Sequence, residues 1–247
     1  MKRFLTPLGL FALVALGFGL GAFYMRLNTG SLIPLQDAVV PRVAADSYAV
    51  SLEDEAGRYI DISPAEPADT LFIFYPGGLV RPQAYVWLGV ALTRTGVRTV
   101  ISVMPFDLAV AAPNRADALL ESLPTYNRTI IGGHSLGGAF AARYALNHPD
   151  TVDALVLMGA YPAESDDLSA MDLPTLVLAA ENDGLATLQE VQAGLERLPE
   201  AAQTSIIPGA VHSFFGRYGP QAGDGIPSVV RAEAEAVIYN ALSGFLR

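Results

Sequence analysis

The residues of this chain best suited to covalent chemistry lie in one short segment, Gly133-His134-Ser135-Leu136-Gly137. The segment matches the pattern G-x-S-x-G and falls between a predicted strand and a predicted helix. A very tight turn there lifts the serine hydroxyl out of the sheet, and the flanking glycines keep side chains away from crowded backbone. This setting, more than the five-residue pattern, predicts that Ser135 is a nucleophile and that Gly133 and Gly137 shape its turn.

A serine nucleophile needs a general base, and the sequence holds three histidines. His134 adjoins the serine inside the turn, where its side chain cannot easily reach round to the hydroxyl. His148 ends a predicted helix and is expected at the surface or as a cap. His212 follows the last predicted strand, where the chain order serine, acid, histidine places the base. We therefore predict that His212 is the base.

The third group must be a carboxylate between Ser135 and His212 that orients the imidazole and stabilises its protonated form. Asp183 follows the strand predicted over residues 175–179 and precedes a helix. It is therefore expected at the carboxyl end of a strand, where the acid belongs.

Three other carboxylates stay open for this role. Glu181 lies two residues before Asp183, where a loop-shaping role is the simpler interpretation. Asp166 and Asp167 follow the preceding predicted strand and are most simply residues of a solvated turn. Asp183 is the favoured acid.

Attack by a serine also requires two backbone N–H donors for the negative oxygen of the tetrahedral intermediate. One is expected from Leu136, at the start of a helix whose dipole helps slightly. The other is expected from the loop Pro76-Gly77-Gly78-Leu79, where glycines let the backbone approach a substrate. Gly78 is the first choice for this donor and Leu79 the second.

Strands alternating with helices are predicted over residues 49–246, which indicates a mostly parallel sheet covered on both faces. The first two strands, at 49–52 and 58–62, are expected to pair around a turn. Further strands are predicted at 70–75, 97–103, 129–131, 154–158, 175–179 and 204–207, and helices at 82–94, 115–123, 137–147, 185–198 and 228–246. Reactive groups in such sheets gather at the carboxyl ends of strands, where the motifs above lie.

The composition of the chain excludes several classes of protein. The 247 residues are 51% hydrophobic and 16% charged, which suits one sizeable domain with an appendage and excludes a disordered chain. A net charge of −10 is a poor match for nucleic acid, and neutral or cationic substrates fit better. The absence of cysteine excludes disulfides, a cysteine nucleophile and thiolate metal sites. Neither a metal nor a cofactor is expected.

The amino terminus carries an uncharged stretch from Phe4 to Met25, bracketed by Lys2 and Arg3 before it and Arg26 after it. A helix of that length spans roughly the ~30 Å hydrocarbon core, which predicts a transmembrane anchor over residues 4–25, with a cleaved signal peptide as the alternative. The excess of positive charge before the stretch predicts an exported domain. The predicted parts are an anchor or signal segment (1–26), a linker (27–46) and a catalytic domain (47–247).

Four segments together resemble the α/β-hydrolase fold family: Phe74–Gly78, Gly133–Gly138, Ala180–Gly184 and Gly209–Gly219. More narrowly, they are similar to a small bacterial branch related to dienelactone hydrolases, often with an N-terminal membrane segment. The segment Pro220–Gly225 also resembles that branch. The resemblance implies a doubly wound α/β sheet, ester hydrolysis without a cofactor, and a triad of Ser135, Asp183 and His212.

The chain departs from that branch at two positions. Pro76 stands where many relatives have a histidine before the glycine, which affects the geometry of the oxyanion loop. Ser135 replaces the cysteine of true dienelactone hydrolases, which argues against that specific activity.

Only 16 residues, Gly159–Pro174, separate the strands predicted at 154–158 and 175–179. Large hydrolases of the fold usually insert a helical lid there, and this chain has no room for one. A shallow, open cleft favours small or short-acyl esters. The sequence thus predicts a lidless, carboxylesterase-like serine hydrolase. Acyl transfer or amide cleavage with the same triad, and a non-catalytic binding member of the fold, are the alternatives.

Overall fold

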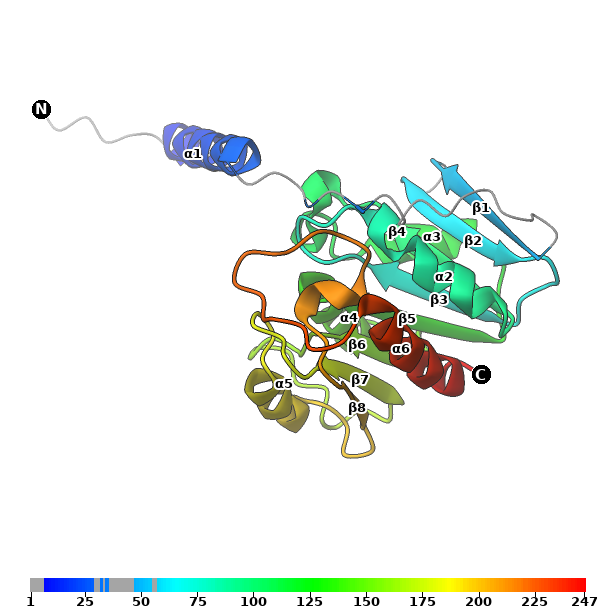
Figure 1. Ribbon diagram of the computed structural model, residues 1–247. Coiled ribbons are helices and arrows are strands. Elements are labelled where there is room, and N and C mark those ends of the chain that lie inside the picture. Colours follow the sequence, from blue (N-terminus) through cyan, green and yellow to red (C-terminus); the bar gives the residue numbers. More distant parts are fainter. Residues whose placement is uncertain (1–6, 29–31, 33, 36–46, 55–56) are drawn as a thin grey trace, which may run out of the picture. The chain divides into compact units, whose positions relative to one another are not determined.

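The computed structural model describes residues 7–28, 32, 34–35, 47–54 and 57–247, and within them one eight-stranded sheet (Figure 1). The strands lie in the order β1-β2-β4-β3-β5-β6-β7-β8. Strands β3 to β8 are parallel, whereas β2 is antiparallel to both of its neighbours. Their bounds are β1 (Tyr48–Glu53), β2 (Tyr59–Pro64), β3 (Thr70–Tyr75), β4 (Val97–Ser102), β5 (Arg128–His134), β6 (Ala154–Met158), β7 (Thr175–Ala180) and β8 (Gln203–Ile207).

The central strands are apolar without interruption because helices cover both of their faces. All five residues of β6 are buried, as are all six of β7. By contrast, four of the six residues of the edge strand β1 are exposed. The predicted antiparallel pair at the amino-terminal edge is confirmed, with Glu53 opposite Tyr59.

Helices pack on both faces of the sheet, as the alternating pattern predicted. One buried cluster joins α2 and α6 to one face, and a second joins α3, α4 and α5 to the other. The α-helices are α2 (Val86–Thr93), α3 (Arg115–Ser122), α4 (Leu136–Asn147), α5 (Leu188–Gly194) and α6 (Arg231–Phe245). Short 3₁₀ turns are η2 (Pro82–Tyr85), η3 (Pro105–Asp107), η4 (Ala109–Ala111), η5 (Leu195–Arg197) and η6 (His212–Phe215).

Three predicted helices differ from those observed, and the one predicted at 228–246 begins at Arg231. The stretch 82–94 divides into η2 and α2, and the helix predicted from Leu185 begins only at Leu188. Thr187 and Glu190 form a reciprocal capping box that sets the start of α5. Leu185 and Ala186, before the cap, instead belong to the loop after Asp183, and their N–H groups donate to its carboxylate.

Residues 159–174, between β6 and β7, are all described and contain no helix. The predicted absence of a helical lid at this position is therefore confirmed.

The chain divides into two units, residues 1–31 and residues 32–247. The first contains α1 (Pro7–Asn28). However, no helix in the described part of the chain is long and apolar enough to cross a membrane, so the structure does not support the predicted transmembrane segment at 4–25.

Most of the predicted linker 27–46 lies outside the described residues, but a short piece of it belongs to the unit 32–247. The Leu32 N–H donates to the Leu79 carbonyl at 2.6 Å, and the Leu35 N–H donates to the Arg217 carbonyl at 3.0 Å. These two bonds attach the backbone at Leu32 and Leu35 to loops of the larger unit.

Candidate active site

Ser135 lies in the turn between β5 and α4, at the carboxyl end of a central strand. Its backbone has φ 53° and ψ −127°, a conformation strained for any residue with a side chain. The Ser135 N–H donates to the carbonyl of Met158 at 3.0 Å, which ties the turn to β6. Within the described residues the Ser135 hydroxyl makes no hydrogen bond, so it is available to a substrate.

The glycines that flank Ser135 are required by the packing of the turn. A Cβ on Gly137 would lie 2.2 Å from the carbonyl oxygen of Tyr75, and a Cβ on Gly133 would lie 2.6 Å from the same oxygen. Both separations are far below van der Waals contact with backbone that cannot move aside. The spacing of the two glycines in the motif is therefore a steric requirement of the strand–turn–helix geometry.

Asp183 and His212 form a buried pair. The Nδ1 atom of His212 lies 2.8 Å from Oδ2 of Asp183, and the two side chains are only 1% and 0% exposed. The other carboxylate oxygen of Asp183 accepts the N–H groups of Leu185 and Ala186 at 2.8 Å and 2.7 Å. These hydrogen bonds fix the orientation of the carboxylate that pairs with the imidazole.

His212 lies beside the turn of the serine. Its ring centroid is 4.4 Å from that of His134, the residue before Ser135. No hydrogen bond joins the Ser135 hydroxyl to the His212 imidazole in the described structure. Such catalytic hydrogen bonds are often long without substrate and tighten when it binds.

The alternative acids are engaged elsewhere. Glu181 accepts the Gly209 N–H at 2.7 Å and so shapes the loop before the histidine. Asp166 is buried and forms an ion pair with Arg143 at 2.9 Å, so its interpretation as part of a solvated turn is wrong. Asp167 accepts a backbone N–H within its own loop. These contacts leave Asp183 as the carboxylate that meets the histidine.

The two residues expected to supply the oxyanion donors, Gly78 and Leu136, lie next to each other. A Cβ on Gly78 would lie 3.0 Å from Cδ2 of Leu136, so the two loops are in contact. Within the described residues neither the Gly78 nor the Leu136 N–H has an acceptor. The Leu79 N–H instead donates to the Asp107 carbonyl at 2.7 Å. This bond occupies Leu79 and leaves Gly78 and Leu136 as the available pair.

Backbone strain concentrates around this edge of the sheet. Four residues other than glycine have positive φ among the described residues, namely Leu79, Phe106, Asp107 and Ser135. They lie in the loops that follow β3, β4 and β5, and an ion pair of 3.4 Å between Arg81 and Asp107 links the first two loops. Such strain persists only where the surroundings enforce it, and it is common at functional sites.

A buried polar chain lies behind the reactive groups. The Tyr85 hydroxyl accepts the Gly77 N–H at 3.1 Å and lies 2.8 Å from Nδ1 of His134. Burial raises the pKa of Tyr85, so its hydroxyl keeps its proton and can donate it to His134. Burial, with repulsion from His212 second, lowers the pKa of His134 well below its ordinary value. His134 is therefore a neutral link between two loops.

Sequence reasoning did not find Tyr85, because a tyrosine in an apolar helical stretch carries no signal of its own. It predicted that His134 would not act as the base, and the structure points that side chain toward Tyr85. His148 is the C-cap residue of α4 and stacks on Tyr144, in agreement with the predicted capping role.

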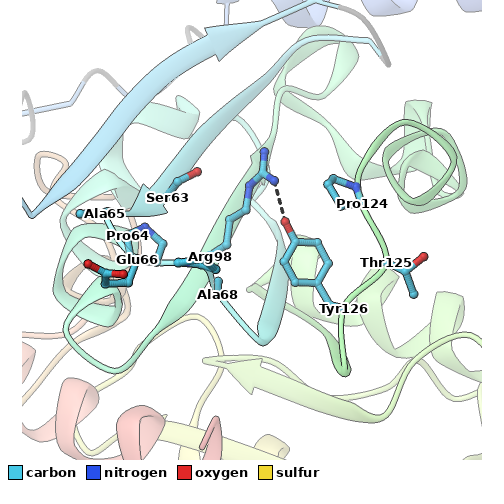
Figure 2. A pocket seen from close by; sticks show the side chains of 10 residues that line it. Ser63, Pro64, Ala65, Glu66, Ala68, Arg98, Pro124, Thr125 and Tyr126 are labelled. Atoms are coloured by element: carbon cyan, nitrogen blue, oxygen red, sulfur yellow. Dashed lines mark hydrogen bonds between the residues drawn. The ribbon is translucent and has the colours of Figure 1, made fainter.

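A separate pocket lies where the parallel strands begin, next to Arg98 and Tyr126 (Figure 2). Ser135 follows the carboxyl end of β5, at the opposite edge of the sheet. Among the pocket's lining residues, Arg98 is bonded to both oxygens of Asp61 at 2.8 Å and to the Tyr126 hydroxyl at 2.6 Å. All three guanidinium nitrogens of Arg98 therefore already donate hydrogen bonds within the protein. None of the residues that line this pocket is a histidine, and its serine, Ser63, donates to the Asp61 carboxylate at 3.1 Å. The lining consists of Ser63, Pro64, Ala65, Glu66, Pro67, Ala68, Arg98, Pro124, Thr125 and Tyr126.

Comparison with known proteins agrees with this geometry. The model of the alpha/beta hydrolase family matches residues 71–236, and the chain belongs to that family. A search of curated proteins finds no match. Among solved structures, the crystal structure of a predicted CIB-like hydrolase from Thermoplasma acidophilum is similar, with 16% identity and a TM-score of 0.59 over 80% of this chain and 99% of the other. That likeness shows the shared fold, and the family supports a hydrolase.

Proposed function

We propose that the protein is a serine hydrolase that cleaves small or short-acyl carboxylic esters through an acyl-enzyme intermediate. The observation that carries the proposal is the buried pair of Asp183 and His212, 2.8 Å apart, beside a strained turn that presents Ser135. Burial of a carboxylate and an imidazole costs free energy unless the two groups are paired. In the proposed triad, the pairing of Asp183 with His212 orients the imidazole toward the serine.

In the proposed reaction the Ser135 hydroxyl attacks the carbonyl carbon of the ester while His212 takes its proton. Asp183 holds Nδ1 of the imidazole and stabilises the imidazolium that forms. The tetrahedral oxyanion is bound by the N–H groups of Gly78 and Leu136. His212 then returns the proton to the leaving alcohol, and water repeats the sequence on the acyl-enzyme.

The choice of small esters rests on the short connection between β6 and β7. Residues 159–174 contain no helix that could cover the site. Long acyl chains need an extended apolar surface, which a lid commonly provides in this fold.

A panel of p-nitrophenyl esters of graded acyl length tests the proposal. We expect hydrolysis with kcat/KM highest for acetate or butyrate and falling for longer chains, and a burst of p-nitrophenol that matches the enzyme concentration. Highest activity on long chains would contradict the substrate class. An acyl product on an added alcohol in place of the free acid would show a transferase.

We also propose that the catalytic domain lies outside the cytoplasm. The proposal rests on the uncharged stretch from Phe4 to Met25 and on the basic residues that precede it. A fusion of alkaline phosphatase, which is active only after export, to residue 247 should be active in the bacterial host. An inactive alkaline phosphatase fusion, together with an active fusion of a reporter that works only in the cytoplasm, would contradict the proposal.

A further inference from the structure

One carboxylate next to the site has no role in the chemistry described above. The Asp224 side chain accepts the N–H groups of His212 and Gly225 at Oδ1, at 2.9 Å and 2.8 Å, and the N–H of Ser213 at Oδ2, at 2.9 Å. Both oxygens therefore hold the start of η6, the short turn that carries the proposed base. Hydrogen bonds from backbone N–H groups to an ionised carboxylate are stronger than neutral ones.

The loop that carries Asp224 is fitted against the loop of the acid. A Cβ on Gly225 would lie 1.7 Å from the carbonyl oxygen of Asn182, and a Cβ on Gly184 would lie 2.4 Å from the carbonyl oxygen of Gly223. The Asn182 side-chain amide also donates to the Ile226 carbonyl at 3.1 Å. The Asp224 loop thus contacts the residues on both sides of Asp183 as well as the turn of His212.

The carbonyl groups of the same segment are held by a charge of the opposite sign. Arg231 donates to the carbonyls of Ser213, at 2.7 Å, of Gly216, and of Tyr218, at 3.1 Å. Its guanidinium also lies over the Phe214 ring, 4.5 Å from the centroid. The segment from His212 to Tyr218 is therefore fixed at its amides by a carboxylate and at its carbonyls by a guanidinium.

We propose that Asp224 is a positioning residue that sets the place of the His212 imidazole for proton transfer. The proposal rests on the proposed function, because it assigns His212 as the base. Without the Asp224 carboxylate, two amides at the start of η6 lose their acceptors and the turn can shift. Misplacement of a catalytic group by about 1 Å can cost about 100-fold in rate, so small movements of this turn matter.

Labelling by a fluorophosphonate tests the proposal, since the reaction needs both the serine and its base. Its endpoint counts folded, competent sites, whereas its rate constant reports the geometry of those sites. For Asp224→Ala we expect the wild-type endpoint with a rate constant lowered by about 10- to 100-fold, and a matching fall in kcat on p-nitrophenyl acetate with KM within about threefold.

Asp153→Ala is the matched control. Asp153 also accepts a backbone N–H, that of Thr129 at 2.6 Å, but at the amino ends of the strands. Its labelling rate constant should equal that of the wild type. Asp224→Asn keeps one acceptor oxygen and nearly the same volume, so it should fold even if the alanine variant does not, with a smaller loss of rate.

An unchanged rate constant in Asp224→Asn and Asp224→Ala would overturn the proposal. A loss seen only as a lowered endpoint would also overturn it, because that is the mark of a purely structural residue. Failure of the wild type itself to be labelled would instead overturn the proposed function, and the inference with it.

Discussion

At the scale of single residues, the candidate site combines the groups proposed to react with groups that hold loops in place. Tyr85 and His134 belong to the second kind. They join the oxyanion loop at Gly77 to the turn of Ser135, and both are fully buried. Even the glycine at 77 is explained by them, since a Cβ there would lie 2.7 Å from the His134 ring and 2.9 Å from the Tyr85 hydroxyl.

The neutral state of His134 makes stability depend on pH. Its pKa is lowered by burial, so below about pH 6.5 the unfolded chain binds a proton that the folded chain does not. The stability that neutral His134 contributes is complete above that pH and is lost as the pH falls toward the lowered pKa.

We therefore predict that the free energy of unfolding of the wild type falls, relative to that of His134→Gln, by up to about 1.4 kcal/mol per pH unit below pH ~6.5. Urea unfolding of both proteins from pH 8 to pH 4.5 measures this difference. Parallel curves over that range would show that His134 has the same pKa in the folded and the unfolded chain, which would contradict the prediction.

The acid of the triad can be tested separately. Asp183→Asn removes the charge that stabilises the imidazolium while keeping the shape of the side chain, and kcat should fall by about 10⁴-fold. Steady-state kinetics with p-nitrophenyl acetate measure the loss, and thermal unfolding checks that the variant folds. A rate near that of the wild type would return the role to Glu181, Asp166 or Asp167.

At the scale of elements, the turn between β5 and α4 depends on close approach of backbone to the loop after β3. Gly137→Ala should destabilise the protein by about 1–3 kcal/mol or more, because its Cβ would overlap the carbonyl oxygens of Tyr75 and Pro76. Gly219→Ala is the matched control, since no atom lies within 4 Å of its Cβ, and it should change stability by less than about 0.5 kcal/mol. Equal melting temperatures for the two variants in calorimetry would contradict this account of the motif.

Sequence predicted the elements best where one physical signal dominated. The bounds of β3 and β6 agree with the prediction because continuous apolar runs end abruptly at turn residues. The start of α5 was misplaced because the apolar period continues into the Asp183 loop, and only the Thr187 capping box marks the true boundary. The order of β3 and β4 in the sheet is set by long-range pairing, which no local pattern carries.

The site was predictable for residues in recognised turns and not for those that support them. Ser135, Asp183 and His212 follow strands, so their order and position placed them at one edge. Asp224 lies in a glycine-rich loop 12 residues after His212, and its bonds to that turn depend on how the chain folds back. Asp166 was misinterpreted because its partner Arg143 lies on a different element.

At the scale of the whole molecule, residues 32–247 form a unit with its own core. Removal of residues 1–31 should leave kcat/KM of the purified protein within about twofold and its melting temperature nearly unchanged. Removal of residues 1–35 should be more costly, by about 1 kcal/mol or more, because the bonds of Leu32 and Leu35 to the Leu79 and Arg217 carbonyls are lost. Calorimetry and ester hydrolysis on both truncations compare the two, and equal stability would show that these bonds contribute nothing.

The proposed function depends above all on Ser135 as the nucleophile, and mass spectrometry of a covalent adduct tests this role most directly. After treatment with a fluorophosphonate, the wild type should gain one phosphonyl group on the peptide that contains Ser135, and folded Ser135→Ala should gain none. A wild type that is folded yet unmodified, or a Ser135→Ala variant modified as fast as the wild type, would contradict the assignment of Ser135 as the nucleophile of a hydrolase.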